Sequence, residues 1–303
     1  MRLLNHRYSQ KIGWSAIATG VLLLPLLWFG GLHFQRPPQV QESRSLFQGV
    51  TYQRSVRSHP RPIMIHVVTI DLMTPGIKPF VTPGDSATSQ ISTETNARTV
   101  SQFVREFKLQ LAINANFFYL FREQTPWDYF PRVGDRVNNV GQVISNGNAY
   151  SQGNRKWSVL CFAADNRVQI LQGGFCPTGT TQAVAGNEVF FANGQPANQG
   201  HDPFKDKPYA RVAVAIDASG EKLWLILVDG KQRFYSEGMT MAELTQFAQQ
   251  LGVEAALNLD GGGSTTLAID TRSGVKVLNA PIHTKVPMRE RAVANQLGFY
   301  ANP

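Results

Sequence analysis

Residues 257–266 read Leu-Asn-Leu-Asp-Gly-Gly-Gly-Ser-Thr-Thr, and the rest of the chain can be placed around them. The apolar run that leads into this stretch, residues 255–259, has the length and composition of a buried β-strand. It ends at Asp260, which three glycines and three hydroxyl side chains follow. Because glycines allow positive φ angles, the backbone N–H groups after Asp260 can approach a bound anion. We therefore predict that Asp260 ends a strand beside a ligand site.

The same stretch also fits a tight turn between two strands, in which Asp260 caps its own backbone. It does not fit the phosphate-binding loop of nucleotide hydrolases, because no lysine follows Gly263. The sequence on either side of this stretch must therefore be used to distinguish a plain turn from a ligand site.

That flanking sequence alternates strand and helix patterns. Residues 63–72 form a long β-type run that a Thr-Pro-Gly turn signal stops. Residues 99–102 and 240–243 are capping boxes, and each opens an amphipathic helix. Residues 211–217 and 223–228 flank Ala-Ser-Gly-Glu and predict a hairpin. These patterns predict an α+β fold of mixed α/β type, a single domain with a mixed β-sheet and packed helices.

The first 61 residues differ in composition from the rest. Residues 12–34 carry no formal charge, a length that can cross a bilayer about 30 Å thick as a helix. We predict that residues 1–34 are a basic tail and a transmembrane anchor; a cleaved signal sequence is the alternative. Residues 35–61, rich in Arg, Gln, Ser and Pro, read as a flexible tether. We predict that residues 62–303 form the folded domain, on the periplasmic or cell-surface side of the membrane, or secreted if the signal is cleaved.

The net charge of +8 is concentrated in the predicted anchor and tether. Residues 1–62 hold eight Lys or Arg and one acid, whereas the remainder holds 21 bases and 20 acids. The body therefore lacks the basic surface that nucleic-acid binding requires. We predict a membrane partner for residues 12–34 and no nucleic-acid partner.

The two cysteines are Cys161 and Cys176. Outside the cytoplasm they could form a disulfide, and the alternative is two buried thiols. The chain has no CxxC, HExxH or Cys/His cluster, which argues against a structural zinc site. No cofactor is predicted as required; carboxylates could hold calcium, although no ligand spacing indicates it.

A second polar stretch, residues 114–118, reads Asn-Ala-Asn-Phe-Phe and follows a predicted strand. Asparagine amides can donate to and accept from sugar hydroxyls, and aromatic rings can cover the C–H face of a sugar. The stretch therefore favours a carbohydrate ligand, although Asn also caps strands and Phe also fills cores.

Six segments in order along residues 63–300 together resemble the phosphodiester glycosidase family, whose bacterial members are exopolysaccharide-related. They are residues 114–118, 211–217, 228–230, 237–240, 258–265 and 290–295. The resemblance implies an extracytoplasmic hydrolase that cleaves a sugar-1-phosphodiester or a related glycosidic bond, in envelope or exopolysaccharide metabolism. The usual Asn-Gly-Gly-Phe-Phe of the family is Asn-Ala-Asn-Phe-Phe here, so Asn116 is expected to reshape the sugar pocket.

The resemblance also implies the site residues. The catalytic group is Asp260, Arg211, Asp229 and Glu237. The substrate-binding group is Asn114, Asn116, Phe118, Gly261, Gly262, Gly263, Ser264, Thr265, Arg291 and Asn295. No metal ligand is assigned.

These residue types suit a phosphate leaving group. An ordinary glycosidase needs an acid to protonate the leaving group, whereas a phosphate needs charge neutralisation, which arginine provides. We therefore expect Asp260 to act at the anomeric carbon as base or nucleophile, while Arg211 and Arg291 hold the phosphate with the glycine-loop N–H groups. Asp229 or Glu237 would orient the sugar or Arg211; a structural ion pair between Arg211 and Asp229 is the alternative. The rival function is a non-catalytic envelope protein that binds polysaccharide.

Overall fold

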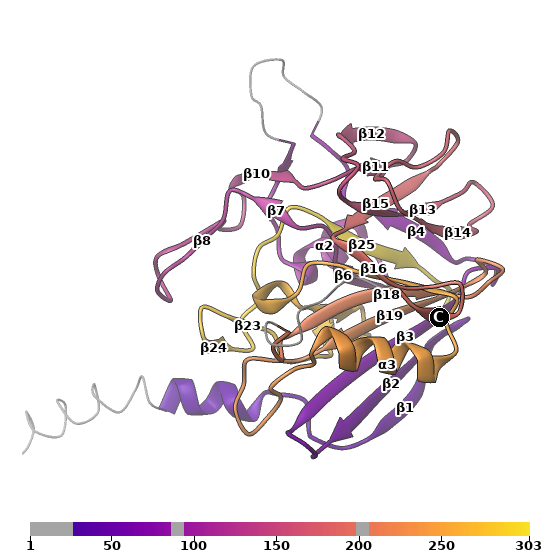
Figure 1. Ribbon diagram of the computed structural model, residues 1–303. Helices are drawn as coiled ribbons and strands as arrows, with labels where there is room; N and C mark the ends of the chain where they lie inside the picture. The colour runs from indigo at the N-terminus through magenta and orange to yellow at the C-terminus, as the bar shows by residue number, and fades with distance from the viewer. Residues whose placement is uncertain (1–26, 86–93, 198–205) are drawn as a thin grey trace, which may run out of the picture.

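The computed structural model describes residues 27–85, 94–197 and 206–303 (Figure 1). The predicted hairpin forms the centre of the molecule, with Ile216 opposite Leu223. It belongs to an eight-stranded antiparallel sheet. In spatial order its strands are β1 (Glu42–Phe47), β2 (Val50–Arg57), β3 (Ile63–Asp71), β19 (Lys222–Val228), β18 (Arg211–Ile216), β20 (Ala255–Asn258), β16 (Glu188–Ala192) and β17 (Gln195–Pro196).

Two five-stranded sheets make a second layer. One has the order β12 (Asn148–Ser151), β11 (Val143–Ser145), β15 (Gln182–Gly186), β13 (Ser158–Phe162) and β14 (Val168–Leu171). The other has the order β22 (Lys276–Val277), β21 (Leu267–Ile269), β6 (Leu111–Asn114), β25 (Gln296–Tyr300) and β4 (Lys78–Val81). The smaller groups are β5 (Thr95–Asn96) with β10 (Arg136–Asn139) and β7 (Phe118–Tyr119), β8 (Arg122–Glu123) with β9 (Tyr129–Phe130), and β23 (Ile282–His283) with β24 (Val286–Pro287).

Both predicted helices are present. Helix α2 (Val100–Phe107) begins at the capping box of Thr99, and α3 (Met241–Leu251) begins at that of Thr240. Helix α3 ends at Gly252, whose φ of 67° is the left-handed conformation that glycine favours. Residues 27–34 are also helical, and the glycine stretch contains one 3₁₀ turn, η1 (Gly262–Ser264).

The core has layers because the strands of the large sheet are buried on both faces. On β18, Val212 and Val214 point into the cluster shared with the second layer, whereas Ala213 and Ala215 point into the cluster that α3 covers. Helix α2 packs on the outer face of the second layer, against Ala112 and Ala268 among others. The order of layers is therefore α3, large sheet, five-stranded sheets, α2.

The sheets are antiparallel rather than mixed. Every pairing between named strands in the described parts of the chain is antiparallel. Unbroken apolar runs such as that of β18 are typical of parallel strands, which are covered on both faces. Here the same run results from helix α3 on one side and a second sheet on the other.

Part of the predicted tether is folded. Residues 42–57 form β1 and β2, and β2 pairs with β3 along its whole length. Val50, Tyr52 and Arg54 alternate on the buried side of β2. Arg54 is 7% exposed, pairs with Glu42 and donates to the carbonyl of Val40 at 2.9 Å. Because a charged residue, Arg54, stands at one of the buried positions, the sequence of β2 lacks the alternation of apolar and polar residues that predicts a strand.

Within residues 27–85, 94–197 and 206–303, no helix is long and apolar enough to cross a bilayer. The anchor predicted for residues 12–34 lies outside these residues except for 27–34. Cys161 and Cys176 form a disulfide, with their Cα atoms 5.8 Å apart. It ties β13 to the segment that follows β14.

Candidate active site

Asp260 lies where the ends of two sheets meet. Its backbone N–H donates to the carbonyl of Ala115 at 3.0 Å, and Asn114 donates from Nδ2 to the carbonyl of Asp260 at 2.6 Å. The Asn114 Oδ1 also accepts from the N–H of Thr266 at 3.0 Å. Asn114 therefore bridges the two ends of the glycine stretch between β20 and β21 and holds it as a compact loop.

Each glycine of this loop has a neighbour where a side chain would stand. A Cβ on Gly262, which has a φ of +61°, would lie 2.6 Å from the hydroxyl of Tyr209. A Cβ on Gly263 would lie 2.4 Å from Nη2 of Arg291. The glycines thus let an aromatic ring and a guanidinium group approach the backbone beside Asp260.

Gly263→Ala is expected to lower kcat/KM by about 100-fold, because the new methyl group displaces Arg291 from its position at the site. Thermal unfolding should change by only a few degrees if the guanidinium group alone moves. Steady-state kinetics and a melting curve measure the two effects. Gly31→Ala is the control, since no atom lies within 4 Å of a Cβ there; equal kinetics for both variants would contradict the expectation.

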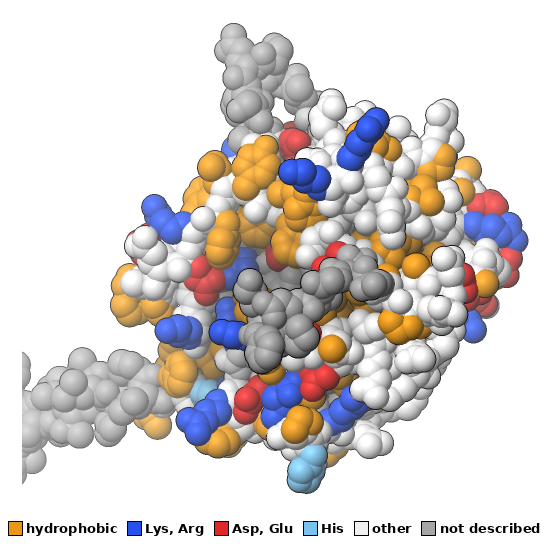
Figure 2. Space-filling view, viewed as in Figure 1, with side chains coloured by type: hydrophobic (Ala, Val, Ile, Leu, Met, Phe, Trp, Pro, Cys, Tyr) orange, Lys and Arg blue, Asp and Glu red, His pale blue; other side chains and the backbone are white. Residues whose placement is uncertain are grey.

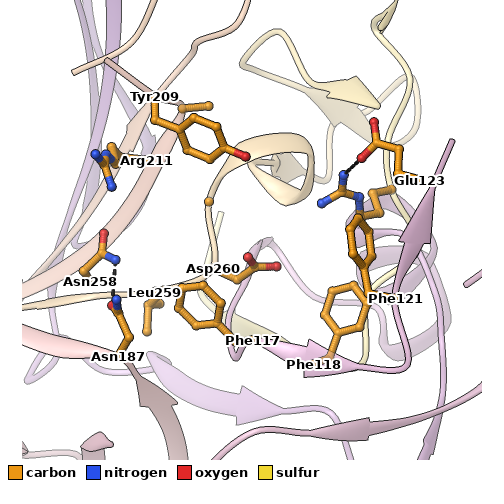
Figure 3. Close-up of a pocket in the computed structure, with 13 residues that line it drawn as sticks. Phe117, Phe118, Phe121, Glu123, Asn187, Tyr209, Arg211, Asn258, Leu259 and Asp260 are labelled. Carbon is orange, nitrogen blue, oxygen red and sulfur yellow. Dashed lines mark hydrogen bonds and ion pairs between the residues drawn. The ribbon is translucent and has the colours of Figure 1, made fainter. Parts of the chain in front are cut away.

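Asp260 faces a cavity of about 370 Å³. In Figure 3, Arg211 and Glu123 lie on opposite sides of this cavity, and Asp260 and the hydroxyl of Tyr209 lie between them. Aromatic rings form much of its wall. The lining residues are Phe117, Phe118, Phe121, Glu123, Asn187, Tyr209, Ala210, Arg211, Asn258, Leu259, Asp260, Gly261 and Arg291.

Burial raises the pKa of Asp260 to about 6, although a hydrogen bond from Ser264, the charge of Arg291 and a bond from the Gly261 backbone oppose the rise. The carboxyl group therefore titrates within the range in which enzymes place a general base. Above about pH 6 it is a carboxylate held in a poorly solvated cavity, which makes it more basic than an exposed aspartate.

Arg291 is 6% exposed and is held by three different side chains. It donates from Nη1 to Ser264 Oγ at 3.1 Å and from Nε to His283 Nδ1 at 3.3 Å, and its Nη2 forms an ion pair with Glu123. Its guanidinium carbon is 4.6 Å from the ring centre of Phe121. An arginine has five N–H donors, so these contacts leave two for a ligand.

His283 accepts from Arg291 in its neutral form. Burial and the nearby charge of Arg291 lower its pKa to about 4. A neutral imidazole can accept at Nδ1, whereas a protonated one cannot. His283 therefore fixes the orientation of Arg291 across the range in which Asp260 titrates.

Arg211 forms the opposite wall. Its Nε donates to the carbonyl of Met239 at 3.0 Å, and its Nη2 donates to the carbonyl of Lys207 at 3.3 Å and lies 3.5 Å from Asp206. Burial lowers the pKa of Arg211 below the usual range of arginine. Beside it, Asn258 donates from Nδ2 to Asn187 Oδ1 at 2.7 Å (Figure 3).

Asp229 does not line the cavity and is 1% exposed. It lies 3.0 Å from His66 Nε2 and accepts from Asn279 Nδ2 at 2.9 Å. Asn279 also donates to the carbonyl of Thr265 at 3.0 Å, so Asp229 supports the glycine loop from behind. Among the ion pairs of the described residues, none joins Asp229 to Arg211, so the alternative of a structural pair between them is wrong; Arg211 pairs with Asp206 instead.

Two of the predicted amide side chains, Asn116 and Asn295, hydrogen-bond to each other and hold the nearby backbone. Asn295 accepts at Oδ1 from the backbone N–H of Asn116 at 2.8 Å and donates to Asn116 Oδ1 at 3.0 Å. Asn116 also donates to the carbonyl of Val140 at 3.0 Å and accepts from the N–H of Ala185 at 2.9 Å. Both side chains are buried, and Asn116 therefore shapes the pocket through the backbone that it holds.

The structure thus divides the predicted site residues into two groups. The cavity is lined by Asp260, Arg211, Phe118, Gly261 and Arg291. The residues that do not line it are Asp229, Glu237, Asn114, Asn116, Gly262, Gly263, Ser264, Thr265 and Asn295. Of this second group, Ser264 contacts both Asp260 and Arg291.

Several lining residues carried no sequence prediction. Phe117 and Asn258 stand inside the quoted stretches, so their motifs could have indicated them. Glu123 comes from the β8–β9 hairpin, Tyr209 from the segment before β18, and Asn187 from the link between β15 and β16. No motif marks these three, because tertiary packing alone brings them to Asp260. As for calcium, the described residues contain no group of three or more His, Cys, Asp or Glu side chains suited to a metal ion.

A protein family and several solved structures are similar to this chain. The family model described as phosphodiester glycosidase matches residues 107–300. No curated protein matches the sequence. Several solved structures share the fold, at identities that show the fold alone, and three of them follow.

The first is the catalytic domain of zebrafish N-acetylglucosamine-1-phosphodiester alpha-N-acetylglucosaminidase, auto-inhibited by its pro-peptide, with TM-score 0.59 and 18% identity over 90% of this chain and 92% of that chain. The second is a hypothetical protein from Synechocystis, with TM-score 0.53 and 17% identity over 88% of this chain and 64% of that chain. The third is a protein of Burkholderia pseudomallei described as exported, with TM-score 0.60 and 12% identity over 89% of this chain and 98% of that chain.

The matched segment covers more than half of the chain and contains Asp260, Arg211 and Arg291. Members of this family are hydrolases that act on phosphodiester glycosidic bonds. The chain belongs to the phosphodiester glycosidase family.

Proposed function

We propose that this protein hydrolyses a sugar-1-phosphodiester outside the cytoplasm, in envelope or exopolysaccharide metabolism. The observation that carries the proposal is the carboxyl group of Asp260, which titrates near pH 6 in a cavity and is linked through Ser264 to the guanidinium group of Arg291. A base beside a fixed cation suits a reaction in which a neutral water attacks carbon and an anion leaves.

The bond that breaks joins the anomeric carbon to a phosphate oxygen. The bonding electrons go to that oxygen, and water supplies a hydroxyl group to the carbon and a proton to the base. The departing phosphate needs no proton, so a second carboxyl group acting as an acid is unnecessary. Asp260 is the base that receives the proton from water, or the nucleophile that first attacks the sugar.

Arg291 is the better placed of the two arginines to hold the phosphate. Its charge acts to lower the pKa of Asp260, and it retains two N–H donors. Arg211 is on the far side of Asp260, and two of its nitrogens already donate to backbone carbonyls (Figure 3). We assign Arg211, with Asn187 and Asn258, to the wall that meets the sugar hydroxyls, and the rings of Phe117 and Phe118 to the C–H face of the sugar.

The test is hydrolysis by the full chain of a panel of sugar-1-phosphodiesters and matched aryl glycosides. Turnover of a phosphodiester, with release of a phosphate monoester, supports the proposal. Turnover of aryl glycosides alone would indicate an ordinary glycosidase. No turnover on any member, with sugar binding retained, would favour the polysaccharide-binding function.

The pH dependence distinguishes a base from an acid at Asp260. We expect kcat/KM to rise with pH and to be half-maximal near pH 6, because the pKa of Asp260 is raised to about 6 and the reaction needs its ionised form. A rate profile from about pH 4.5 to about pH 8 measures this, on a substrate with a good leaving group. A rate that falls as pH passes 6 would mean that the protonated form is the active one.

A further inference from the structure

A second cavity of about 920 Å³ adjoins the Asp260 cavity, and Phe121 and Glu123 line both. We call it the outer cavity. Its lining residues are Trp28, Phe29, Phe121, Glu123, Gln124, Thr125, Pro126, Trp127, Lys231, Thr284, Lys285, Val286 and Arg289. Except for Lys231, which follows β19, they come from the helix of residues 27–34 and from the segments around the β8–β9 and β23–β24 hairpins, which lie on the same side of the molecule (Figure 1).

The wall of the outer cavity is apolar and open. Trp127 is 76% exposed, Trp28 61% and Phe121 51%. Of the fourteen large apolar side chains that are exposed in the described parts of the chain, eight lie in two segments, 27–34 and 119–127, and both segments contribute to this wall. Figure 2 shows hydrophobic side chains with Lys and Arg among them at the left of the face, beside the N-terminal segment. Such a patch marks a binding surface rather than a solvated one.

Cations stand at the junction between the two cavities. The ammonium group of Lys231, which lines the outer cavity, lies 5.3 Å from the ring centre of Tyr209, which lines the Asp260 cavity. Burial alone would raise the pKa of Glu123, yet Arg291, the Thr284 N–H, His283 and Lys231 together hold it below the usual range. Because this one carboxylate faces two groups that stay cationic, Arg291 and Lys231, the junction has a net positive charge that can bind a phosphate.

Trp28 and Phe29 are the two outer-cavity residues that come from the helix of residues 27–34. They stand near the end of residues 12–34, the uncharged run of the sequence. An apolar chain that leaves the junction through the outer cavity would therefore reach the rings of Trp28 and Phe29. Arg289, the arginine that lines this cavity, already donates to Pro126, Thr284 and Tyr129, so its guanidinium group is engaged within the protein.

We propose that the outer cavity is the aglycone subsite, and that the substrate is a sugar-1-phosphodiester whose phosphate carries an apolar chain. The inference rests on the proposed function. The sugar occupies the Asp260 cavity, the phosphate lies at the junction between Arg291 and Lys231, and the chain lies against Trp127 and Phe121. The products are the free sugar and the phosphate monoester of the lipid alcohol.

Binding of n-hexyl phosphate and methyl phosphate to the full chain, measured by calorimetry in one non-ionic detergent at fixed concentration, tests the subsite without any turnover. Each buried methylene strengthens binding by about fourfold, so burial of only three of the extra methylenes of n-hexyl phosphate would make it bind about 60-fold more tightly than methyl phosphate. Trp127→Ser should remove most of that difference. Phe175→Ser, which alters a residue that is 51% exposed and outside both cavities, should keep it. Equal binding of the two phosphates would overturn the subsite.

Turnover separates failure of the subsite from failure of the proposed function. The same sugar-1-phosphate is offered as its hexyl, methyl and glyceryl diesters. A kcat/KM ratio that favours the hexyl diester and falls in Trp127→Ser supports the inference, whereas equal rates for all three would keep the hydrolase and reject the apolar aglycone. No hydrolysis of any diester, together with tight binding of hexyl phosphate, would reject the hydrolase and keep the apolar phosphate site.

Discussion

Replacing Asp260 with Asn is expected to lower kcat on a sugar-1-phosphodiester by about 10²- to 10⁴-fold, the range that general acid–base catalysis contributes. The amide keeps the size of the carboxyl group and cannot accept a proton from water. KM should change by only a few-fold, because Arg291 and the aromatic wall still bind the substrate. Asp270→Asn, at an exposed position beyond β21, is the matched control and should keep full activity. Full turnover in Asp260→Asn would remove Asp260 from the chemistry.

The same variant should be more stable than the wild type at alkaline pH. The folded protein holds the pKa of Asp260 at about 6, above the ordinary aspartate value of 3.8, so the free energy of unfolding falls as pH rises through 6. Asn carries no charge and avoids this loss, which is on the order of 3 kcal/mol at pH 8. Below about pH 4 the two proteins should unfold alike. Denaturant unfolding at the two pH values shows whether the loss of activity has left the fold intact.

Replacing Arg291 with Gln should lower kcat/KM on the phosphodiester by about 10²- to 10³-fold, the cost of removing one donor from a developing anion. The loss should shrink on substrates with better leaving groups, because these need less stabilisation of the departing charge. Arg291→Lys should fall between, since lysine keeps the charge but cannot contact Ser264, His283 and Glu123 at once. Kinetics across a series of leaving groups measures both effects.

Arg291→Gln also leaves Glu123 without its partner, so a structural effect has to be separated from a catalytic one. Arg167→Gln is the control for loss of an arginine ion pair, because Arg167 pairs with Asp165 and Glu221 at the surface. If Arg291→Gln lowered turnover equally for good and poor leaving groups and also lowered the melting temperature, Arg291 would be structural.

The parts of the fold that could be predicted are those whose sequence pattern lies within one continuous segment. The capping boxes of Thr99 and Thr240 lie within their own helices, and the hairpin of β18 and β19 is set by the turn between them. Strand direction across the sheets could not be predicted in this way, because the partner of a strand lies far along the chain. For β2, the inward Arg54 concealed even the strand itself.

The candidate site divides along the same line. Asp260, Arg211 and Arg291 stand in recognisable motifs, and packing brings them to one cavity. The same motifs also contain Asn114, Asn295 and similar residues that hold the backbone, so a motif alone does not separate contact from support. Glu123 and Tyr209 belong to no motif, and only their tertiary position reveals them.

Strands β1 and β2 determine how this protein can be shortened. Strand β3 is among the most apolar strands of the large sheet, and β2 covers one of its edges with hydrogen bonds along its whole length. A truncation that begins at residue 61 would remove both strands and leave that edge open to pairing with other molecules. A recombinant domain should therefore begin at Glu42, the first residue of β1, or earlier, if it is to stay monomeric in solution.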